Sequence, residues 1–267
     1  MQIGELPGPV TLMTHGAGEP LLYPDLSMLL QKATKIPHLV VGFMTNGMLL
    51  DKDWVARLID FQVDWIALSI DGVVPRTHDF FRVGADLKKI EENVMRLIEE
   101  KDRQGSDRPF LHFNMVGYPE ILNQSLDYVM KWIPYAQDVT ISKFRPVGSR
   151  KLWSEAAPVA FRPCPLLHRQ MVISFDGKGG LCCEDIHLNV VLGDANHDSL
   201  LDIFTISPTY REYRRAHREG SIDNLPLCRD CHVWGGDIPL RNEEIELSGV
   251  LTKKTCTPAF EFYQAVS

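Results

Sequence analysis

The sequence predicts an α/β protein, with a parallel sheet in its first half and a small cysteine-bearing unit in its second half. Apolar runs of strand length alternate with amphipathic runs of helical spacing from residue 9 to residue 145, which is the pattern of repeated βα units. The strand-like runs are apolar throughout, as expected for strands covered on both faces. All six cysteines lie after residue 163, where the alternation has ended. Such strands fit either a doubly wound sheet or part of a barrel.

Most of the expected strands of the first half end in a short polar or glycine-bearing segment. The runs that contain them are 10–14, 38–47, 63–72, 109–117 and 138–144, and the helices between them are 23–34, 51–61, 86–105 and 124–136. Asp25 is placed to cap the first of these helices, and Gly105 provides a stop for the third. In both topologies the chemistry belongs at the carboxyl ends of the strands.

After about residue 150 the regular alternation gives way to a loop-rich segment. Residues 170–185 predict two strands joined by a turn at Asp176-Gly177, a sequence typical of tight hairpins. Helical spacing follows from about Leu200 to Arg218, and no periodicity is visible after Trp234. We therefore expect a sheet domain over 1–150, a cysteine-bearing domain over 151–235 and a tail over 236–267.

The acidic composition limits the classes of function. A net charge of −7 and a pI near 5.7 argue against a nucleic-acid-binding surface. Basic residues cluster at 210–220, where we expect a solvated helix face. No apolar run of about 18 residues predicts a membrane span, and the first residues do not resemble a secretory signal. A cytoplasmic protein is expected, in which clustered cysteines favour metal binding over disulfides.

The cysteines predict a single site. Cys228 and Cys231 form a C-x-x-C pair, which brings two thiolates to one point and needs two further ligands. Cys164 precedes the expected hairpin and Cys182 lies on its second strand, so the hairpin can bring these two together. We expect a four-cysteine site of Cys164, Cys182, Cys228 and Cys231. Their composition leaves Zn²⁺ and an iron–sulfur cluster both open.

The cysteine segment resembles the twitch domain, a shorter relative of the SPASM domain that extends many radical S-adenosyl-L-methionine (SAM) enzymes. The resemblance rests on a cysteine before a D-G-x4-C hairpin, here SFDGKGGLC, and a distant P-x-C-x-x-C, here PLCRDC. It implies a [4Fe–4S] cluster, and its spacing selects Cys182 over Cys183, which we expect to point into packing. Residues 232–255 contain no cysteine, so one auxiliary cluster is implied and Cys256 is expected to be structural.

The first half resembles the radical SAM barrel. GAGEP (16–20) looks like the family's G-G-E-P motif, whose backbone polar groups hold the amino group of the SAM methionine, and TNG (45–47) and SIDG (69–72) look like the next two strand ends. Arg82 matches an arginine that pairs with the SAM carboxylate, a contact that suits a guanidinium. The resemblance implies a partial (β/α)6 barrel lacking its first βα unit. The implied SAM contacts are Gly16, Gly18, Glu19, Asn46, Ser69 and Arg82.

The sequence departs from this family at one motif. Radical SAM enzymes carry C-x-x-x-C-x-x-C after the first barrel strand, to hold the cluster that binds SAM, and this sequence has no cysteine before Cys164. The chain as written is therefore not expected to cleave SAM. We expect an N-terminally truncated enzyme, with a degenerate relative as the alternative. Truncation would leave the strand at 10–12 as an unpaired edge, so we expect instability or association through it.

The resemblance implies hydrogen abstraction from a small-molecule or peptide substrate, with dehydrogenation or peptide modification as candidate reactions. The cysteine spacing looks like that of the superfamily's aminocyclitol dehydrogenase. The implied partner is an electron donor such as flavodoxin or ferredoxin, with no nucleic acid and no membrane. His112, Lys143 and Arg145 lie on strands or at strand ends and could face the substrate. The alternatives are a catalytically inactive, metal-stabilised binding or scaffold protein and a zinc-bound α/β protein of unrelated activity.

Overall fold

The protein is described by a computed structural model that covers residues 1–144, 161–229, 231, 233, 239, 241–257 and 259–266. The chain divides into two compact units. The first, called the sheet unit here, contains residues 8–144 and most of the described residues after 238. The second, called the cysteine unit, contains residues 1–7, the described residues from 161 to 233, and a short piece at 257–259.

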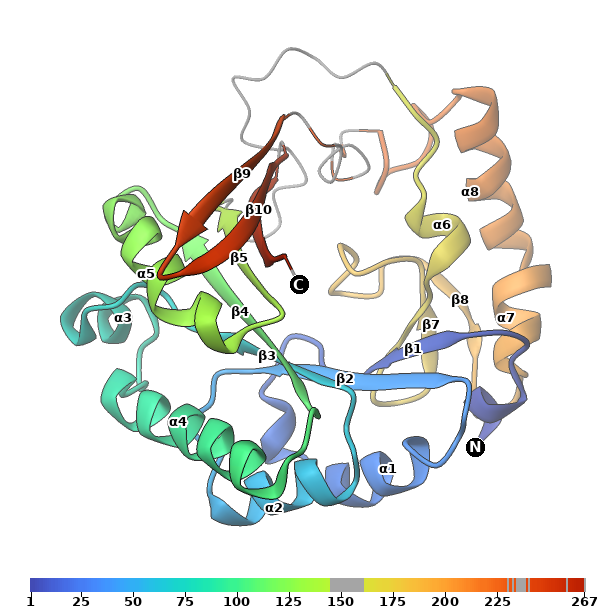
Figure 1. Ribbon diagram of the computed structural model, residues 1–267. Helices are drawn as coiled ribbons and strands as arrows, with labels where there is room; N and C mark the ends of the chain where they lie inside the picture. The colour runs from blue at the N-terminus through green and yellow to red at the C-terminus, as the bar shows by residue number, and fades with distance from the viewer. Residues whose placement is uncertain are drawn as a thin grey trace. The chain divides into compact units, whose positions relative to one another are not determined.

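The sheet unit is built on one large sheet, with the strand order β1-β2-β3-β4-β5-β11-β10-β9 in the described residues (Figure 1). Neighbouring strands from β1 to β5 are parallel, as the βα alternation predicts, and β11, β10 and β9 continue the sheet in antiparallel pairing. The strands are β1 Val10–Met13, β2 Leu39–Thr45, β3 Trp65–Ser69, β4 Phe110–Gly117, β5 Asp138–Lys143, β9 Arg241–Leu247, β10 Val250–Cys256 and β11 Phe260–Ala265.

The helices of the sheet unit connect its parallel strands. They are η2 Pro20–Leu22, α1 Leu26–Ala33, α2 Lys52–Asp60, α3 Pro75–Phe81, α4 Leu87–Gln104, η3 Leu122–Gln124, α5 Ser125–Trp132 and η4 Ile133–Tyr135. Asp51 and Asp86 cap α2 and α4 by accepting hydrogen bonds from backbone N–H groups, and Gly105 ends α4 in the left-handed conformation. Asp25 occupies the cap position of α1 but its side chain makes no capping hydrogen bond, so that part of the prediction is wrong.

The two faces of the parallel strands differ in how deeply their residues are buried. Every second residue of β2, β3 and β4 is fully buried beneath the helices, as Phe43, Ile66 and Phe113 show. In Figure 1, α1, α2 and α4 lie along this side of the strands. The alternate residues lie on the other face, where Trp65, His112 and Asn114 are half buried, whereas Ala67 and Ser69 are buried. The second face is therefore more open than the first, and it adds polar side chains such as His112 and Asn114 to the apolar residues that the sequence predicts.

The last three strands occupy a stretch in which the sequence shows no pattern. β11 pairs with β5, so that Tyr263 lies opposite Val139, and β10 and β9 follow as a hairpin. Charged side chains interrupt the apolar alternation here, because they pair with one another across the strands. Lys254 Nζ lies 3.2 Å from Glu261 Oε2 and 3.8 Å from Glu243 Oε1. The C-terminal segment is thus part of the sheet unit.

The cysteine unit combines a small antiparallel sheet with helices. Its elements are η1 Gln2–Glu5, α6 Leu166–Arg169, β6 Val172–Ile173, β7 Lys178–Gly180, β8 Val191–Asp194, α7 Leu200–Ile206 and α8 Pro208–Glu219. The β6–β7 hairpin turns at Gly177, whose φ of +90° favours glycine. The helix expected from about Leu200 to Arg218 is divided in two at Ser207, because Pro208 opens α8. Apolar residues of α6, α7 and α8 form the core of this unit.

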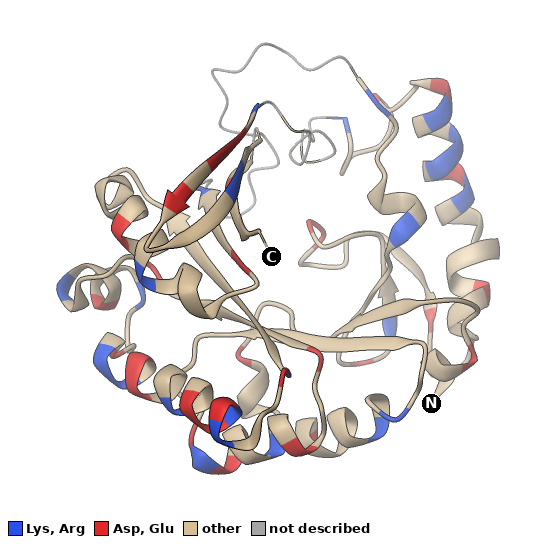
Figure 2. Ribbon diagram, viewed as in Figure 1, with Lys and Arg blue, Asp and Glu red and all other residues tan. Residues whose placement is uncertain are grey.

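Two further features of the chain agree with its sequence. Arg211, Arg215 and Arg218 are exposed, so the basic cluster forms a solvated face of α8. Figure 2 shows blue Lys and Arg positions along this helix. Among the described residues, no helix combines the length and apolar character that crossing a membrane requires. The predicted fold class, a mixed α/β protein with a parallel sheet and a small second unit, is confirmed.

Candidate functional site

Glu19 ties the end of β1 to the end of β2. Its Oε1 accepts hydrogen bonds from the Thr45 hydroxyl at 2.7 Å and from the Leu21 backbone N–H at 3.2 Å. Its Oε2 accepts from the Asn46 backbone N–H at 2.9 Å. The Asn46 side chain in turn accepts from the Met48 N–H at 2.8 Å and shapes the turn after β2. Both Glu19 oxygens are therefore engaged within the chain, and this carboxylate positions the neighbouring loop.

Gly16 and Gly18 lie exposed in that loop, and neither has a positive φ. A Cβ atom built on either glycine would meet no atom of the described chain within 4 Å. Gly42 of β2 is different, because a Cβ there would lie 2.3 Å from the Trp65 carbonyl oxygen. Packing therefore demands glycine at position 42, whereas nothing within this structure demands it at positions 16 and 18. Glycine at these two positions would also allow a ligand to approach the backbone closely.

At the end of β3, Ser69, Asp71 and Arg82 form a connected group. Arg82 Nε donates to Asp71 Oδ2 at 2.7 Å, and Arg82 Nη2 donates to the Ser69 hydroxyl at 2.9 Å. Asp71 is held in turn by the Val116 backbone N–H, which donates to Oδ1 at 2.7 Å. The Asp71 side chain is 1% exposed and that of Arg82 is 26% exposed. The guanidinium is therefore fixed on one side and reaches solvent on the other.

His78 of α3 supports this group from behind. Its Nδ1 accepts a hydrogen bond from the Asp71 backbone N–H at 3.0 Å, and the ring is fully buried. Burial lowers the pKa of His78, and the nearby Arg82 guanidinium lowers it further. The ring is thus held neutral, as an acceptor for the Asp71 N–H.

The half-buried face of the sheet carries a histidine–aspartate pair. His112 Nδ1 lies 2.5 Å from Asp138 Oδ2, and the two residues are register partners on β4 and β5. Trp65 stands edge-on between His112 and His15, with ring centroids 5.8 and 6.2 Å away. Ser142 lies on the same face of the sheet as His112, so Lys143, the next residue of β5, lies on the other face. There its positive charge helps to lower the pKa of Glu261. Of the three residues expected to face a substrate, Arg145 lies outside the described residues.

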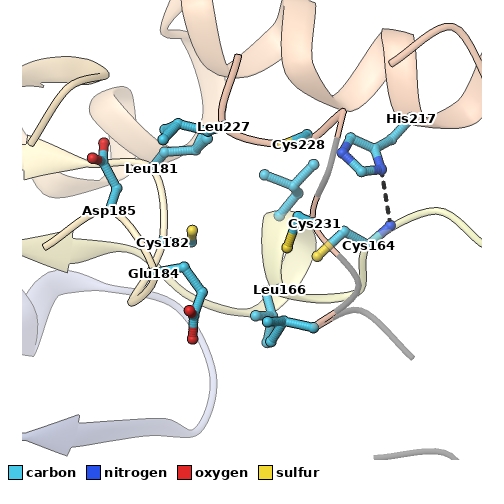
Figure 3. Close-up of a pocket in the computed structure, with 12 residues that line it drawn as sticks. Cys164, Leu166, Leu181, Cys182, Glu184, Asp185, His217, Leu227, Cys228 and Cys231 are labelled. Atoms are coloured by element: carbon cyan, nitrogen blue, oxygen red, sulfur yellow. Dashed lines mark hydrogen bonds between the residues drawn. The ribbon is translucent and has the colours of Figure 1, made fainter. Parts of the chain in front are cut away.

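In the cysteine unit, the four cysteines singled out in the sequence line one pocket. Cys164 precedes α6, Cys182 follows β7, and Cys228 and Cys231 come from the segment after α8, so three separate stretches of chain meet (Figure 3). The other lining residues are Leu166, Leu167, Leu181, Glu184, Asp185, His217, Leu227 and Val233. The pocket is thus a largely apolar space surrounded by thiols.

Each cysteine loop is fixed by local hydrogen bonds. The Cys164 backbone N–H donates to His217 Nδ1 at 3.2 Å, which ties this loop to α8. The loop after Cys182 is closed by the buried Asp185 carboxylate, which accepts from the Asn189 and Val190 backbone N–H groups. The Cys231 N–H donates to the Cys228 carbonyl at 3.0 Å and forms the turn of the C-x-x-C pair. The pocket walls are therefore organised by the chain itself.

Burial governs the acidity of the pocket thiols. It raises the pKa of Cys182 to about 12, although the backbone N–H groups of Glu184 and Asp185 donate to its sulfur and oppose the shift. Burial also raises the pKa of Cys164, against N–H donation from Leu166 and Leu167. A metal that binds here would displace the protons of the thiols. The resulting thiolates would be stabilised by the backbone N–H groups that donate to their sulfur atoms.

The remaining cysteines lie outside this pocket. Cys183 is exposed, so the expectation that it points into packing is wrong, while its separation from Cys182 agrees with adjacent residues facing apart. Cys256 is half buried at the end of β10, where Arg241 Nη2 lies 4.0 Å from its sulfur. No group of three or more His, Cys, Asp or Glu residues in the described part of the chain converges tightly enough to hold a metal ion. The four thiols surround a space rather than a point.

Comparison with known families decides the identity of the two units. The model of the radical SAM superfamily matches residues 2–133. The SPASM model, an iron–sulfur cluster-binding domain, matches residues 164–232, from the first pocket cysteine to the residue after the last. The chain belongs to the radical SAM superfamily. Residues 164–232 form a SPASM-type domain, which confirms the resemblance to this group of cluster-binding domains.

One curated relative of this radical SAM chain, an uncharacterized protein of Treponema pallidum (strain Nichols), is 25% identical over 245 residues. The match covers 81% of this chain and 62% of the relative, so the chain spans less than two thirds of that protein.

Solved structures share the radical SAM fold. BtrN in complex with AdoMet and 2-DOIA is 17% identical and has a TM-score of 0.55, over 86% of this chain and 76% of BtrN. SuiB of Streptococcus suis bound to the precursor peptide SuiA is 16% identical and has a TM-score of 0.59, over 77% of this chain and 56% of SuiB. At these identities the likeness shows the fold alone.

Two residues of these sites were missed in the sequence. Asp71 stands inside the SIDG motif, eleven residues before Arg82, and an acidic residue at that strand end could have been taken as the partner of the arginine. His217 lies in the basic stretch at 210–220, and its sequence context gives no sign that it reaches the Cys164 loop. Only the folded chain brings His217 to the cysteine pocket.

Proposed function

We propose that this chain acts in a radical SAM enzyme, binds SAM at the strand ends of the sheet unit, and holds one auxiliary [4Fe–4S] cluster in the cysteine unit. The observation that supports it most directly is the pocket lined by Cys164, Cys182, Cys228 and Cys231. It lies inside the residues that match an iron–sulfur cluster-binding domain.

The donor set of the cysteine pocket fits such a cluster. Four thiols from three segments surround an apolar space, and backbone N–H groups donate to the Cys164 and Cys182 sulfurs. All-cysteine ligation, a low-polarity surrounding and hydrogen bonds to sulfur are the features by which proteins hold and tune iron–sulfur clusters. A cluster bound here supplies one-electron chemistry, and the chain supplies its ligands and its exclusion from water.

The SAM contacts are proposed at the ends of β1, β2 and β3. Asp71 holds Arg82 through Nε, and Ser69 holds it through Nη2. The described contacts do not use Nη1, which is proposed to bind the carboxylate of SAM. The open backbone at Gly16 and Gly18 suits close approach of the SAM methionine. Glu19 positions this loop against Thr45 and Asn46, and thereby acts on SAM indirectly.

The substrate is proposed to lie against the half-buried face of the sheet. His112 is paired with Asp138 there, and Asn114 accepts a hydrogen bond from the Ser142 hydroxyl, so this face offers groups that can take up a proton or bind polar atoms. SuiB, which shares the fold, is described with a bound precursor peptide, and this supports a peptide substrate. BtrN, described with 2-DOIA, supports the small-molecule alternative.

The residues of this chain do not fit the cluster that binds SAM in the family, because no cysteine precedes Cys164. The residues of this sequence therefore supply no thiolates for that cluster, and we assign no step to it. SAM binding and the auxiliary cluster are the parts of the proposal that its residues carry.

Anaerobic reconstitution of the full chain with ferrous iron and sulfide tests the auxiliary cluster. We expect a brown protein that holds iron and sulfide in equal amounts, about four of each per chain, as a [4Fe–4S] cluster requires. One zinc ion per chain, with no uptake of sulfide, would overturn this part. Calorimetric titration with SAM tests the proposed SAM site. We expect the wild type to bind SAM and Arg82→Ala to abolish binding. Binding unchanged by that substitution would contradict the assignment of Arg82.

A further inference from the structure

His217 presents a buried ring nitrogen that has no hydrogen-bond partner among the described residues. The residue is 1% exposed, on the inner side of α8, and its Nε2 makes no hydrogen bond with any described residue. The same side chain lines the cysteine pocket (Figure 3). Buried polar atoms are almost always hydrogen-bonded, so a buried nitrogen without a partner beside a pocket points to a group that binds in it.

The hydrogen bond at the other ring nitrogen fixes the chemical form of His217. The Cys164 backbone N–H is a donor, so Nδ1, which lies 3.2 Å from it, must be the acceptor and carries no proton. A neutral imidazole with an unprotonated Nδ1 has its proton on Nε2. The unpartnered atom is therefore an N–H donor.

The chain offers this donor no acceptor among the described residues. The aliphatic wall of the pocket, which includes Leu227 and Leu181, cannot accept a hydrogen bond. The lining also contains the Glu184 and Asp185 carboxylates, but neither lies within hydrogen-bond distance of His217 Nε2. A cluster bound by the four cysteines would place sulfur atoms in the pocket, and these can accept a hydrogen bond.

The ring is also held in place. Phe161 stacks on it with a centroid distance of 6.0 Å, and the neighbouring Tyr213 and Ala216 are buried in the core of the unit. The Nδ1 bond to Cys164 fixes the remaining rotation. The direction of the Nε2–H is therefore set before a cluster binds.

We infer that His217 is a positioning residue of the auxiliary cluster, whose Nε2–H donates a hydrogen bond to a sulfur atom of the bound cluster while Nδ1 anchors the Cys164 loop. This inference rests on the proposed cluster. A hydrogen bond to cluster sulfur stabilises the more negative, reduced state, and so raises the reduction potential. His217 thus sets how readily the cluster accepts an electron.

Two isosteric substitutions separate the two roles of the ring. In His217→Asn the amide oxygen stands near the place of Nδ1, so the Cys164 N–H keeps its acceptor and the distal donor is lost. In His217→Gln the amide nitrogen stands near the place of Nε2, so a donor is kept and the anchor is lost. His168→Asn changes an exposed histidine of the same unit that does not line the pocket, and is the control.

The midpoint potential of the reconstituted full chain, followed by electron paramagnetic resonance during a redox titration, is the measurement. We expect His217→Asn to bind iron and sulfide like the wild type and to show a more negative potential. His217→Gln is expected to keep a potential nearer the wild type and to lose its cluster several-fold faster to a chelator. A full cluster with wild-type potential in His217→Asn would overturn the inference and leave the proposed function standing. Failure of the wild type to take up iron and sulfide would overturn both.

Discussion

Arg82 Nε lies 2.7 Å from Asp71 Oδ2, and the carboxylate of this pair is almost completely buried. The Val116 and Arg82 donors approach different oxygens of the same carboxylate, so Asp71 connects the end of β4 with the residue after α3. The Ser69 hydroxyl receives the second guanidinium contact. A flexible cation is thereby held in one orientation at the strand ends.

Asp71→Asn is expected to weaken SAM binding and to destabilise the sheet unit. The substitution keeps the shape of the side chain and removes the charge that holds Arg82, and a hydrogen bond to a charged group contributes about 1.5–3 kcal/mol. We expect a loss of about 2 kcal/mol in unfolding free energy, measured by urea titration, and at least a tenfold weaker SAM affinity by calorimetry. Arg76→Ala, at an exposed arginine of α3, is the control and should change neither value. Equal effects of both substitutions would refute the pairing.

Gly42→Ala is expected to lower the stability of the protein, whereas Gly16→Ala is expected to lower only its affinity for SAM. At Gly42 the new Cβ would lie 2.3 Å from the Trp65 carbonyl oxygen, so Gly42→Ala should cost about 3 kcal/mol of stability, as overpacking does. At Gly16 the Cβ meets open space, so Gly16→Ala should fold like the wild type and bind SAM more weakly. Thermal unfolding and calorimetry on both variants separate these outcomes. Normal SAM binding by Gly16→Ala would remove the ligand-based reason for glycine there.

The parallel part of the sheet was predictable because its strands are continuous apolar runs such as Leu39–Thr45, which leave little choice of structure. The strands after 240 were not predictable, because residues such as Glu243 and Lys254 satisfy each other across the sheet and hide the alternation. The cysteine site followed from spacing along the chain. His217 and Asp71 act through tertiary contacts with Cys164 and Arg82, and no local pattern announces such contacts.

Stability of the sheet unit is expected to fall between pH 7 and pH 5. Burial and Arg82 lower the pKa of His78, and burial lowers the pKa of His15. Below about pH 6.5 the unfolded chain takes up protons that these folded rings resist, so unfolding is favoured as the pH falls. His78→Asn keeps an acceptor for the Asp71 N–H and removes one titrating group.

The unfolding free energy at pH 5, 6 and 7, from urea titrations, checks this dependence. His78→Asn should show a shallower loss than the wild type, and His197→Asn, at an exposed position, should match the wild type. A wild-type stability that is constant from pH 7 to pH 5, or a variant as steep as the wild type, would contradict the account of His78.

The most direct measurement compares two adjacent residues, in Cys182→Ala and Cys183→Ala, after anaerobic reconstitution and iron and sulfide analysis. Cys182 lines the pocket and Cys183 is exposed outside it. The cluster account predicts that Cys183→Ala retains a full complement of iron and sulfide, whereas Cys182→Ala loses the stable four-iron species. Full retention in Cys182→Ala, or loss in Cys183→Ala alone, would contradict it.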